Sequence, residues 1–481
     1  MRCRFPSTFV LLAASSVACG DVITVDDDGP ADFERIQDAI EAASTGDEIV
    51  VSPGFYIENL DFLGKGIVVR SVEGPLETSV KSLPDSGLPT VTFASKENAS
   101  ARLEGFKLGG GSGAIINDPV FGPSLAGGGI YCYEASPRIV NCEVVGVAIE
   151  GHGAGMLVMR CSPEIESCRF IGGIADGHGG GMYILDSSSP TITNCTFEGN
   201  RAAWGGGITC TVDCDPVLRE CTFVENEAYN VGGGMYVRSS SSPTLDNCSF
   251  IDNIQVGNPV AGGAAFTTYG SGNGGGPCFP VFEQCFFEGN DAQSNGGAVH
   301  AAYSGNISLN NCEFARNRAG DRGGGVYVIG HPEAPTSVVI RNCVLEGNTA
   351  KGDGGGIESR TATVTIDACS ISGNIAGGLG GGCLFEASES SVVTDTTICT
   401  NMPDQVSGLF TDGGGNHIGD FCDSDCPGDI SGDGVVDGAD LTVLLGQWGA
   451  CSKIECPGDL TGDGQVDGAD LTVLLGEWGP C

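Results

Sequence analysis

The clearest arrangement for binding chemistry lies near the C-terminus, where one acidic pattern occurs twice. The stretch "DISGDGVVDGAD" begins at Asp429, and "DLTGDGQVDGAD" begins at Asp459. Each places oxygen-bearing groups at alternate positions of a 12-residue loop, the spacing with which proteins surround Ca²⁺. The groups are Asp429, Ser431, Asp433, Val435, Asp437 and Asp440, followed by Asp459, Thr461, Asp463, Gln465, Asp467 and Asp470, with Val435 and Gln465 acting through their backbone carbonyls. The sequence therefore predicts two calcium sites.

Each loop is followed by an apolar set at helical spacing, which predicts a short amphipathic helix. The sets are Leu441, Leu444, Leu445 and Trp448, and Leu471, Leu474, Leu475 and Trp478. Four cysteines bracket the two halves, and they allow three pairings. We favour Cys426–Cys451 with Cys456–Cys481, because each bond would then staple one loop and its helix.

A second candidate site is a row of residues set four or six positions after recurring glycine triplets. The row contains Tyr131, Tyr183, Tyr236, His300, Tyr327, Glu358 and Arg360. We expect these side chains to face outward from one sheet, where tyrosine rings can stack on the apolar faces of sugars. Glu358 and Arg360, with His300, have the chemistry for acid–base work. The alternative is that the row only stabilises neighbouring strands, and the catalytic residues stay unknown.

The elements that must position this row come from an internal repeat. Nine cysteines recur at intervals of 26 to 37 residues: Cys142, Cys168, Cys195, Cys221, Cys248, Cys285, Cys312, Cys343 and Cys369. An apolar residue lies two positions after each, and an asparagine lies five positions after the later seven. Around them, stretches such as "PTITNCTF" alternate polar and apolar residues, which is typical of a half-buried strand.

A unit of this length suits two or three short strands wound once around a core. Successive coils then stack as parallel strands about 4.8 Å apart, so that like residues form columns. The asparagines are expected to turn the chain in the left-handed conformation that this residue tolerates. The cysteines are expected to be buried, mostly free thiols. The fold class is therefore all-β, a right-handed parallel β-helix over residues 21–400.

The N-terminus and the overall charge limit where the protein acts. Residues 1–20 read as a secretory signal peptide, with lipidation at Cys19 left open, and no later stretch is apolar enough to predict a transmembrane segment. The stretch "DFERIQDAIEAAS", from Asp32 to Ser44, predicts a helix that caps the first coil. A net charge of −39 argues against nucleic acid and anionic membranes as partners.

These motifs resemble two known families. The export signal, the capping helix, "TGDEIVVSPGFY" and the repeated "NCxFxxN" are similar to the β-helix proteins of the pectin-lyase-like superfamily. The doubled loop and helix resembles a type I dockerin, which implies a cohesin-like protein as partner. The usual hydroxyl pair at positions 10 and 11 is Gly-Ala in both loops. His152 and His178 lie in "GHG" tripeptides similar to part of the polygalacturonase signature, but its partner motifs are absent.

Together these features predict a chain of four parts: the signal peptide, the β-helix, a linker over 401–425, and a dockerin-like calcium module over 426–481. The leading interpretation is a secreted or cell-surface protein that associates with polysaccharide and docks to a scaffold. One alternative is a polysaccharide lyase or glycoside hydrolase, and another is a structural or adhesive rod. A fold of this kind hosts all three, so the fold does not decide between them.

Overall fold

The structure is a computed structural model of the whole chain. It describes residues 20–257, 262–270, 275–387, 390–419, 422, 427–431, 435–451, 456–461 and 463–480. The expected signal peptide, Cys19, Asp433, Cys426 and Cys481 lie outside the described residues, apart from Gly20. Among the described residues, no helix combines the length and the apolar character needed to cross a bilayer.

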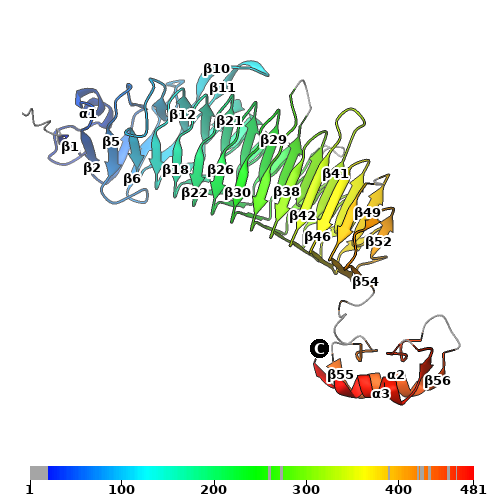
Figure 1. Cartoon of the computed structure of the whole chain (residues 1–481). Coiled ribbons are helices and arrows are strands. Elements are labelled where there is room, and N and C mark those ends of the chain that lie inside the picture. The colour runs from blue at the N-terminus through cyan, green and yellow to red at the C-terminus, as the bar shows by residue number, and fades with distance from the viewer. Residues whose placement is uncertain are drawn as a thin grey trace, which may run out of the picture.

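The described residues from Val22 to Gly419 form a parallel β-helix (Figure 1), as the repeat predicts. A representative coil runs through β22 (Thr191–Thr193), β23 (Thr196–Glu198), β24 (Arg201–Trp204) and β25 (Ile208–Thr211). Each strand pairs in parallel with its counterpart in the next coil, as β23 does with β27 (Thr222–Val224). Four long sheets result, with 15, 14, 13 and nine strands.

The two ends of the β-helix differ from the sequence-based boundaries. Near the N-terminus, α1 spans only Ile36–Ala42 and buries Ile36, Ala39 and Ile40. At the other end, three strands join the sheets after residue 400: β52 (Val406–Gly408), β53 (Thr411–Asp412) and β54 (His417–Gly419). The predicted linker over 401–425 therefore begins too early, because residues up to Gly419 complete a last partial coil.

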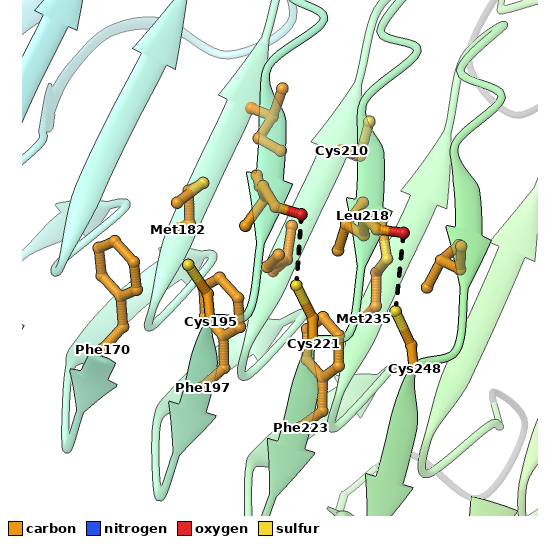
Figure 2. Close-up of a cluster of buried hydrophobic side chains, with 14 of the residues drawn as sticks. Phe170, Met182, Cys195, Phe197, Cys210, Leu218, Cys221, Phe223, Met235 and Cys248 are labelled. Carbon is orange, nitrogen blue, oxygen red and sulfur yellow. Dashed lines mark hydrogen bonds between the residues drawn. The ribbon is translucent and has the colours of Figure 1, made fainter. Parts of the chain in front are cut away.

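Columns of like residues fill the interior (Figure 2). Phe197, Phe223 and Phe250 stack with ring centroids 5.0 and 4.5 Å apart and nearly parallel planes. The cysteines of the repeat are buried and free, as expected. Their thiols donate to backbone carbonyls two residues earlier, as Cys248 does to Asp246 at 3.4 Å, and most also approach a carbonyl of the preceding coil, as Cys248 does Leu218 at 3.8 Å. A cysteine here therefore acts as a small core residue with one weak hydrogen bond.

A chain of side-chain amides runs along the same interior. The Nδ2 group of Asn226 donates to the Oδ1 atom of Asn253 at 3.0 Å and to the carbonyl of Phe197 at 2.8 Å. The same contacts repeat from Asn200 to Asn401. The prediction that these asparagines turn the chain is wrong. The left-handed residues are instead those just before each repeat cysteine, such as Asn247 at φ 51°, and those just before each repeat asparagine, such as Asp252 at φ 51°.

The C-terminal unit is built from two matching halves. The helices are α2 (Gly438–Gly446) and α3 (Gly468–Gly476), each with a capping box at its first turn. Short antiparallel pairs join the halves: β55 (Val435–Val436) with β58 (Gly479–Pro480), and β56 (Gly449–Ala450) with β57 (Gln465–Val466). A small core forms around Val436, Leu444, Val466 and Leu474.

The disulfides correct the pairing favoured from the sequence. Cys451 is bonded to Cys456, five residues away, so neither can staple its own half to Cys426 or Cys481. A second bond joins Cys399, in β51 (Thr397–Cys399), to Cys422. The sequence did not indicate this bond, because Cys399 lies outside the repeat register and Cys422 outside the paired halves.

The asparagine chain predicts a large cost for a small substitution. Asn226→Ala would leave the backbone amide and the Nδ2 group of Asn200 without their acceptor in the core. We expect a loss of about 3 kcal/mol, since each unsatisfied buried group costs about 1–3 kcal/mol. Guanidinium denaturation followed by circular dichroism measures it, with the exposed Thr244→Ala as control. Equal midpoints for the two variants would contradict a stabilising ladder.

Candidate functional site

The sequence-predicted row of side chains does form one column. It runs along the outer face of the 13-stranded sheet through β12 (Ile130–Tyr133), β21 (Met182–Leu185), β29 (Met235–Arg238), β37 (Val299–Ala302), β41 (Val326–Ile329) and β45 (Ile357–Arg360). His300, Tyr327 and Glu358 are direct neighbours on adjacent strands. Arg360 lies in the parallel column two residues along, beside Ile329.

The expectation that this face is open to solvent is wrong for most of the row. Tyr183, Tyr236, His300, Tyr327 and Glu358 are all buried. Of the row residues, all of which the structure describes, Tyr131 and Arg360 stay partly exposed.

The glycine triplets cause this burial. Gly354 has φ +65°, and a Cβ atom there would lie 2.5 Å from the Cβ atom of Glu358. The bend thus folds directly onto the outward side chain four residues later, and only glycine permits that approach.

One part of the column is covered by a hairpin that interrupts the repeat. Strands β10 (Ala114–Asp118) and β11 (Gly122–Ala126) pair with each other, and β11 continues onto β16 (Gly151–His152). Ile116 and Ala126 pack on Leu157, Tyr183 and Leu185 in a small apolar cluster outside the main core. The hydroxyl of Tyr183 donates to the Oδ2 atom of Asp118 at 2.8 Å. This part of the row is therefore an internal contact.

Beside the hairpin, the surface is hollowed into an open depression. Ile115, Ile116, Asn117, Tyr131, Tyr133, Met159 and Arg160 line it. The Tyr131 and Tyr133 rings stack with centroids 6.3 Å apart. The Nη1 atom of Arg160 donates to the Tyr133 hydroxyl at 3.1 Å, and Nε donates to Asp186 at 2.6 Å. The depression thus offers two aromatic faces, a fixed guanidinium and an exposed amide to a ligand.

A charged cluster lies farther along the same face, around Arg322. The Nη1 atom of Arg322 is 2.8 Å from Glu358 Oε1, 3.2 Å from Asp353 and 3.9 Å from Glu386. Arg360 pairs with Glu386 at 2.8 Å. Burial raises the pKa of Glu358 to about 7, although Arg322 acts in the opposite direction. The Glu358 Oε2 atom has no hydrogen-bond partner among the described residues. The cluster therefore holds one carboxyl that exchanges its proton near neutral pH.

His300 does not join that cluster as an acid–base partner. Its Nδ1 atom accepts from the backbone amide of Gly262 at 3.2 Å, and burial lowers its pKa to about 4. Its ring lies 5.1 Å from that of Tyr327, which separates it from Glu358 in the column. His300 is therefore neutral at physiological pH and packs as part of the sheet face.

The two predicted calcium loops have acidic groups held by their own backbone. Asp440 and Asp470, at position 12, are buried in the first turns of α2 and α3. Asp470 accepts from the amides of Thr461 at 2.9 Å and Asp467 at 2.7 Å, and the Asp467 amide contributes most to lowering its pKa. A buried, ionised carboxylate with further acids in sequence is a donor set that suits a hard cation.

Among the loop carboxylates that the structure describes, no three have their ligand atoms gathered within 4.8 Å of one another. In the described part of the chain, the acidic triplet with ligand atoms within 4.8 Å of one another is Asp26, Asp27 and Asp28, at the start of the β-helix. In the second loop, Asp459 instead accepts from the amides of Asp463 and Gly464 at 3.1 and 2.8 Å.

Two functional features were missed from the sequence. The hairpin occurs once, so the repeat gave no register for it, although "NDPVFG" between Asn117 and Gly122 is a turn signal flanked by alternating residues. Arg322 was missed because it lies outside the positions counted from the glycine triplets. Both lie over the outward-facing column, at positions where the repeat does not fix the residue type.

Comparison with known proteins identifies the solenoid. A family model described as "Right handed beta helix region" matches residues 112–275 and 282–422. Two solved structures of pectin methylesterases, one from Erwinia chrysanthemi and one in complex with a hexasaccharide, share 13% and 12% identity. Each match covers 52% of this chain and 89% of the pectin methylesterase chain, with TM-scores of 0.33 and 0.30. No curated protein matches the chain. No residue role is transferred from these structures.

The raised pKa of Glu358 predicts a pH-dependent stability. The folded protein binds this proton more tightly than the unfolded chain, so the contribution is present below about pH 4.5 and lost as pH rises through about 7. Glu358→Gln removes the titrating carboxyl and with it this pH-dependent contribution. We therefore expect the variant to gain stability relative to the wild type between about pH 5 and pH 8, measured as the difference in Tm. The control is Glu313→Gln, at an exposed position, whose Tm should differ from that of the wild type by the same amount at both pH values.

Proposed function

This chain belongs to the right-handed β-helix family, and from that premise we propose that it is an exported protein that binds polysaccharide on its solenoid and docks through its C-terminal unit. The observation that supports the first part is the open depression beside the hairpin. It combines two stacked tyrosines with Arg160 and the exposed Asn117. Aromatic faces pack against the apolar faces of sugar rings, and the polar groups then bind hydroxyls.

The charge of the protein favours a neutral polysaccharide over an acidic one. The chain carries −39, and the described arginines of the depression and of the Arg322 cluster already pair with carboxylates. Arg160, for example, lies 2.6 Å from Asp186 and 3.8 Å from Glu134. At these two places an acidic polysaccharide would meet a negative field, and the described arginines there already pair with carboxylates. Repulsion therefore opposes its approach.

We propose calcium and a docking role for the C-terminal unit. In each loop, the side chains at positions 1, 3, 5, 9 and 12 would hold the ion, with Asp440 and Asp470 supplying the final carboxylates. Calcium bound there would neutralise the loops and fix the ends of α2 and α3. Leu445, Trp448, Leu475 and Trp478 are about half exposed, and they repeat on both halves. Such an apolar surface suits a protein partner, and a cohesin-like one is the leading candidate.

Export agrees with the rest of the proposal. Residues 1–20 carry the signal-peptide pattern, and a polysaccharide ligand lies outside the cell. The disulfides Cys399–Cys422 and Cys451–Cys456 form in oxidising compartments. The helix α1, whose apolar side chains enter the core beside β1 (Val22–Val25), would cover the first coil of the exported solenoid.

One observation favours a second candidate function, acid–base chemistry on polysaccharide. Glu358 exchanges its proton near neutral pH, and Glu386 and Asp353 share the same guanidinium with it. A carboxyl of this kind beside a second carboxylate is the arrangement that glycoside cleavage requires. Its burial places it below Arg322, so substrate would first have to displace that side chain. New reducing ends or unsaturated products from the wild type, absent from Glu358→Gln, would support this candidate.

Polysaccharide binding can be tested at the depression. Replacing Tyr131 and Tyr133 by alanine removes both aromatic faces, and we expect binding to weaken about tenfold for each ring, or about 1.4 kcal/mol. Affinity electrophoresis in a soluble β-glucan, a xylan and a galactomannan measures the loss. Tyr229→Ala, an exposed tyrosine on β28 (Glu227–Val231), is the matched control. Unchanged retention of the double variant would contradict this binding site.

Calcium binding can be tested by stoichiometry. We expect two ions per chain by equilibrium dialysis, and one for Asp470→Asn, because a neutral amide is a weaker ligand for Ca²⁺ than the carboxylate at position 12. Removing calcium with a chelator should lower the Tm of the C-terminal unit and leave the β-helix transition unchanged. The control is Asp176→Asn, an exposed acid on β20 (Ile174–His178). Two ions bound by the Asp470 variant would contradict the assignment.

A further inference from the structure

The hairpin of β10 and β11 is attached to the solenoid along one narrow edge. Its own strands pair over five residues each, from Ala114 with Ala126 to Asp118 with Gly122. Its pairing with the coils is limited to Leu125 with Gly151 and Ala126 with His152. Figure 1 shows it at the rim of the solenoid, near β12 and β21. The hairpin is therefore a separate small element laid over the outer face.

Glycines stand at both points where the hairpin leaves the solenoid. Gly113 has φ +83° just before β10, and Gly127 has φ +67° just after β11. These left-handed positions let the chain reverse direction, and glycine can also leave them at little steric cost. Rotation of both strands about these two positions would break the pairing of β11 with β16 and leave the strand pairing between the regular coils in place.

Beneath the hairpin lies a group of stacked rings. Phe121, at the tip, lies 4.9 Å from His178 and 5.7 Å from His152, measured between ring centroids. His178 in turn stacks on Trp204 at 4.8 Å and on Tyr183 at 5.5 Å. Apart from the Tyr183–Asp118 hydrogen bond, the contacts between the described residues of the hairpin and these rings are apolar or stacking contacts. The hairpin therefore contacts the Tyr183, His152 and His178 rings, whereas Trp204 lies against His178 and keeps partial exposure.

His178 is the residue that makes this closed arrangement sensitive to protonation. It is 1% exposed, and neither ring nitrogen has a hydrogen-bond partner within the described part of the chain. A buried imidazole without partners carries an unsatisfied N–H even when it is neutral, and a proton would add an unpaired charge. The closed hairpin is therefore compatible with neutral His178 alone.

The charged and titratable groups around His178 oppose its protonation. Burial lowers its pKa well below the ordinary value, and the neighbouring His152 and Arg238 lower it further. Tyr183 and Tyr236 face it through their rings. Asp118 is the acid on the hairpin, but its Oδ2 atom accepts from Tyr183, and its Oδ1 atom accepts from Val120 and Phe121. Asp118 raises the pKa of His152 against the effect of burial, so its charge reaches that ring first.

We propose that the hairpin is a hinged cover over a second sugar-binding subsite formed by Tyr183 and Trp204, and that uptake of a proton by His178 releases it. The subsite extends the Tyr131 depression, because Tyr131 and Tyr183 belong to one column with only Leu157 between them. Its ligand is the apolar face of further sugar units of the same neutral polysaccharide. This part rests on the proposed function, whereas the movement of the hairpin does not.

The direction of the pH effect follows from which state binds the proton. In the open state His178 meets water and titrates near its ordinary value of about 6.5. In the closed state it stays neutral to much lower pH. Closure is therefore fully favoured above about pH 6.5 and weakens as pH falls below it. One proton per opening shifts the equilibrium by up to tenfold per pH unit below the open-state pKa, which amounts to about 30-fold between pH 7.5 and pH 5.

Hydrogen exchange measured by mass spectrometry on the full chain tests the movement. We expect peptides covering 113–127 to lose protection about 30-fold between about pH 7.5 and pH 5, after correction for intrinsic rates. Peptides from the coils after Thr244 should not change. His178→Phe keeps a ring in place without a titrating group, so its hairpin should stay protected at pH 5. His331→Gln, an exposed histidine, should behave as the wild type.

A second variant keeps the test decisive if His178→Phe does not fold. Asp118→Ala removes the hydrogen bond to Tyr183, so its hairpin should exchange faster at pH 7.5 already and still respond to pH. A wild-type hairpin that is equally protected at both pH values would overturn the proposal. Equal opening of His178→Phe at pH 5 would overturn the assignment to His178.

Retention on the soluble β-glucan, xylan and galactomannan tests the subsite. We expect the wild type to be retained more strongly at pH 5 than at pH 7.5, with no such gain in His178→Phe or Trp204→Ala. Opening without a gain in retention would overturn the subsite. If no polysaccharide is retained at either pH, the proposed function fails, and hydrogen exchange still decides whether the hairpin is a pH-released cover.

Discussion

Everything in the solenoid depends on one constraint, the register in which each coil lies on the next. The amide chain from Asn200 to Asn401 makes this register strict, because every link donates to the neighbouring side chain and to a carbonyl of the coil before. A slip of one residue would turn each asparagine outward and leave several buried groups unpaired. The phenylalanine and cysteine columns add packing to a register that the amides select.

The same constraint decides where chemistry can occur. Each first glycine of a triplet lies against an outward side chain, so the regular coils cover the outer face of the 13-stranded sheet themselves. Departures from the repeat carry the functional candidates: the inserted hairpin opens a depression at Tyr131, and Arg322 reaches across to Glu358. The irregular positions therefore deserve more functional weight than the repeated ones.

The sequence predicted what depends on periodicity. The parallel β-helix, the buried cysteines and the single column from Tyr131 to Glu358 all follow from counting along the repeat. A two-residue alternation says which side of a sheet a residue faces, but not whether another segment covers that side, so the exposure of Tyr183 and Glu358 was predicted wrongly. The hairpin and the Cys451–Cys456 bond occur once, and a unique contact has no period from which to read it.

The β-helix and the C-terminal unit compensate their acidic charge in different ways, and this difference bears on the proposed calcium sites. In the β-helix, arginines bridge acids of adjacent coils, as Arg169 does between Glu143 and Glu198 at 2.9 Å each. Residues 427–481 contain ten acids and a single basic residue, Lys453. Their carboxylates have no comparable internal partners in the sequence, and backbone amides alone do not neutralise them. Cations from outside are the remaining source of compensation, which is the physical reason to place calcium in these loops.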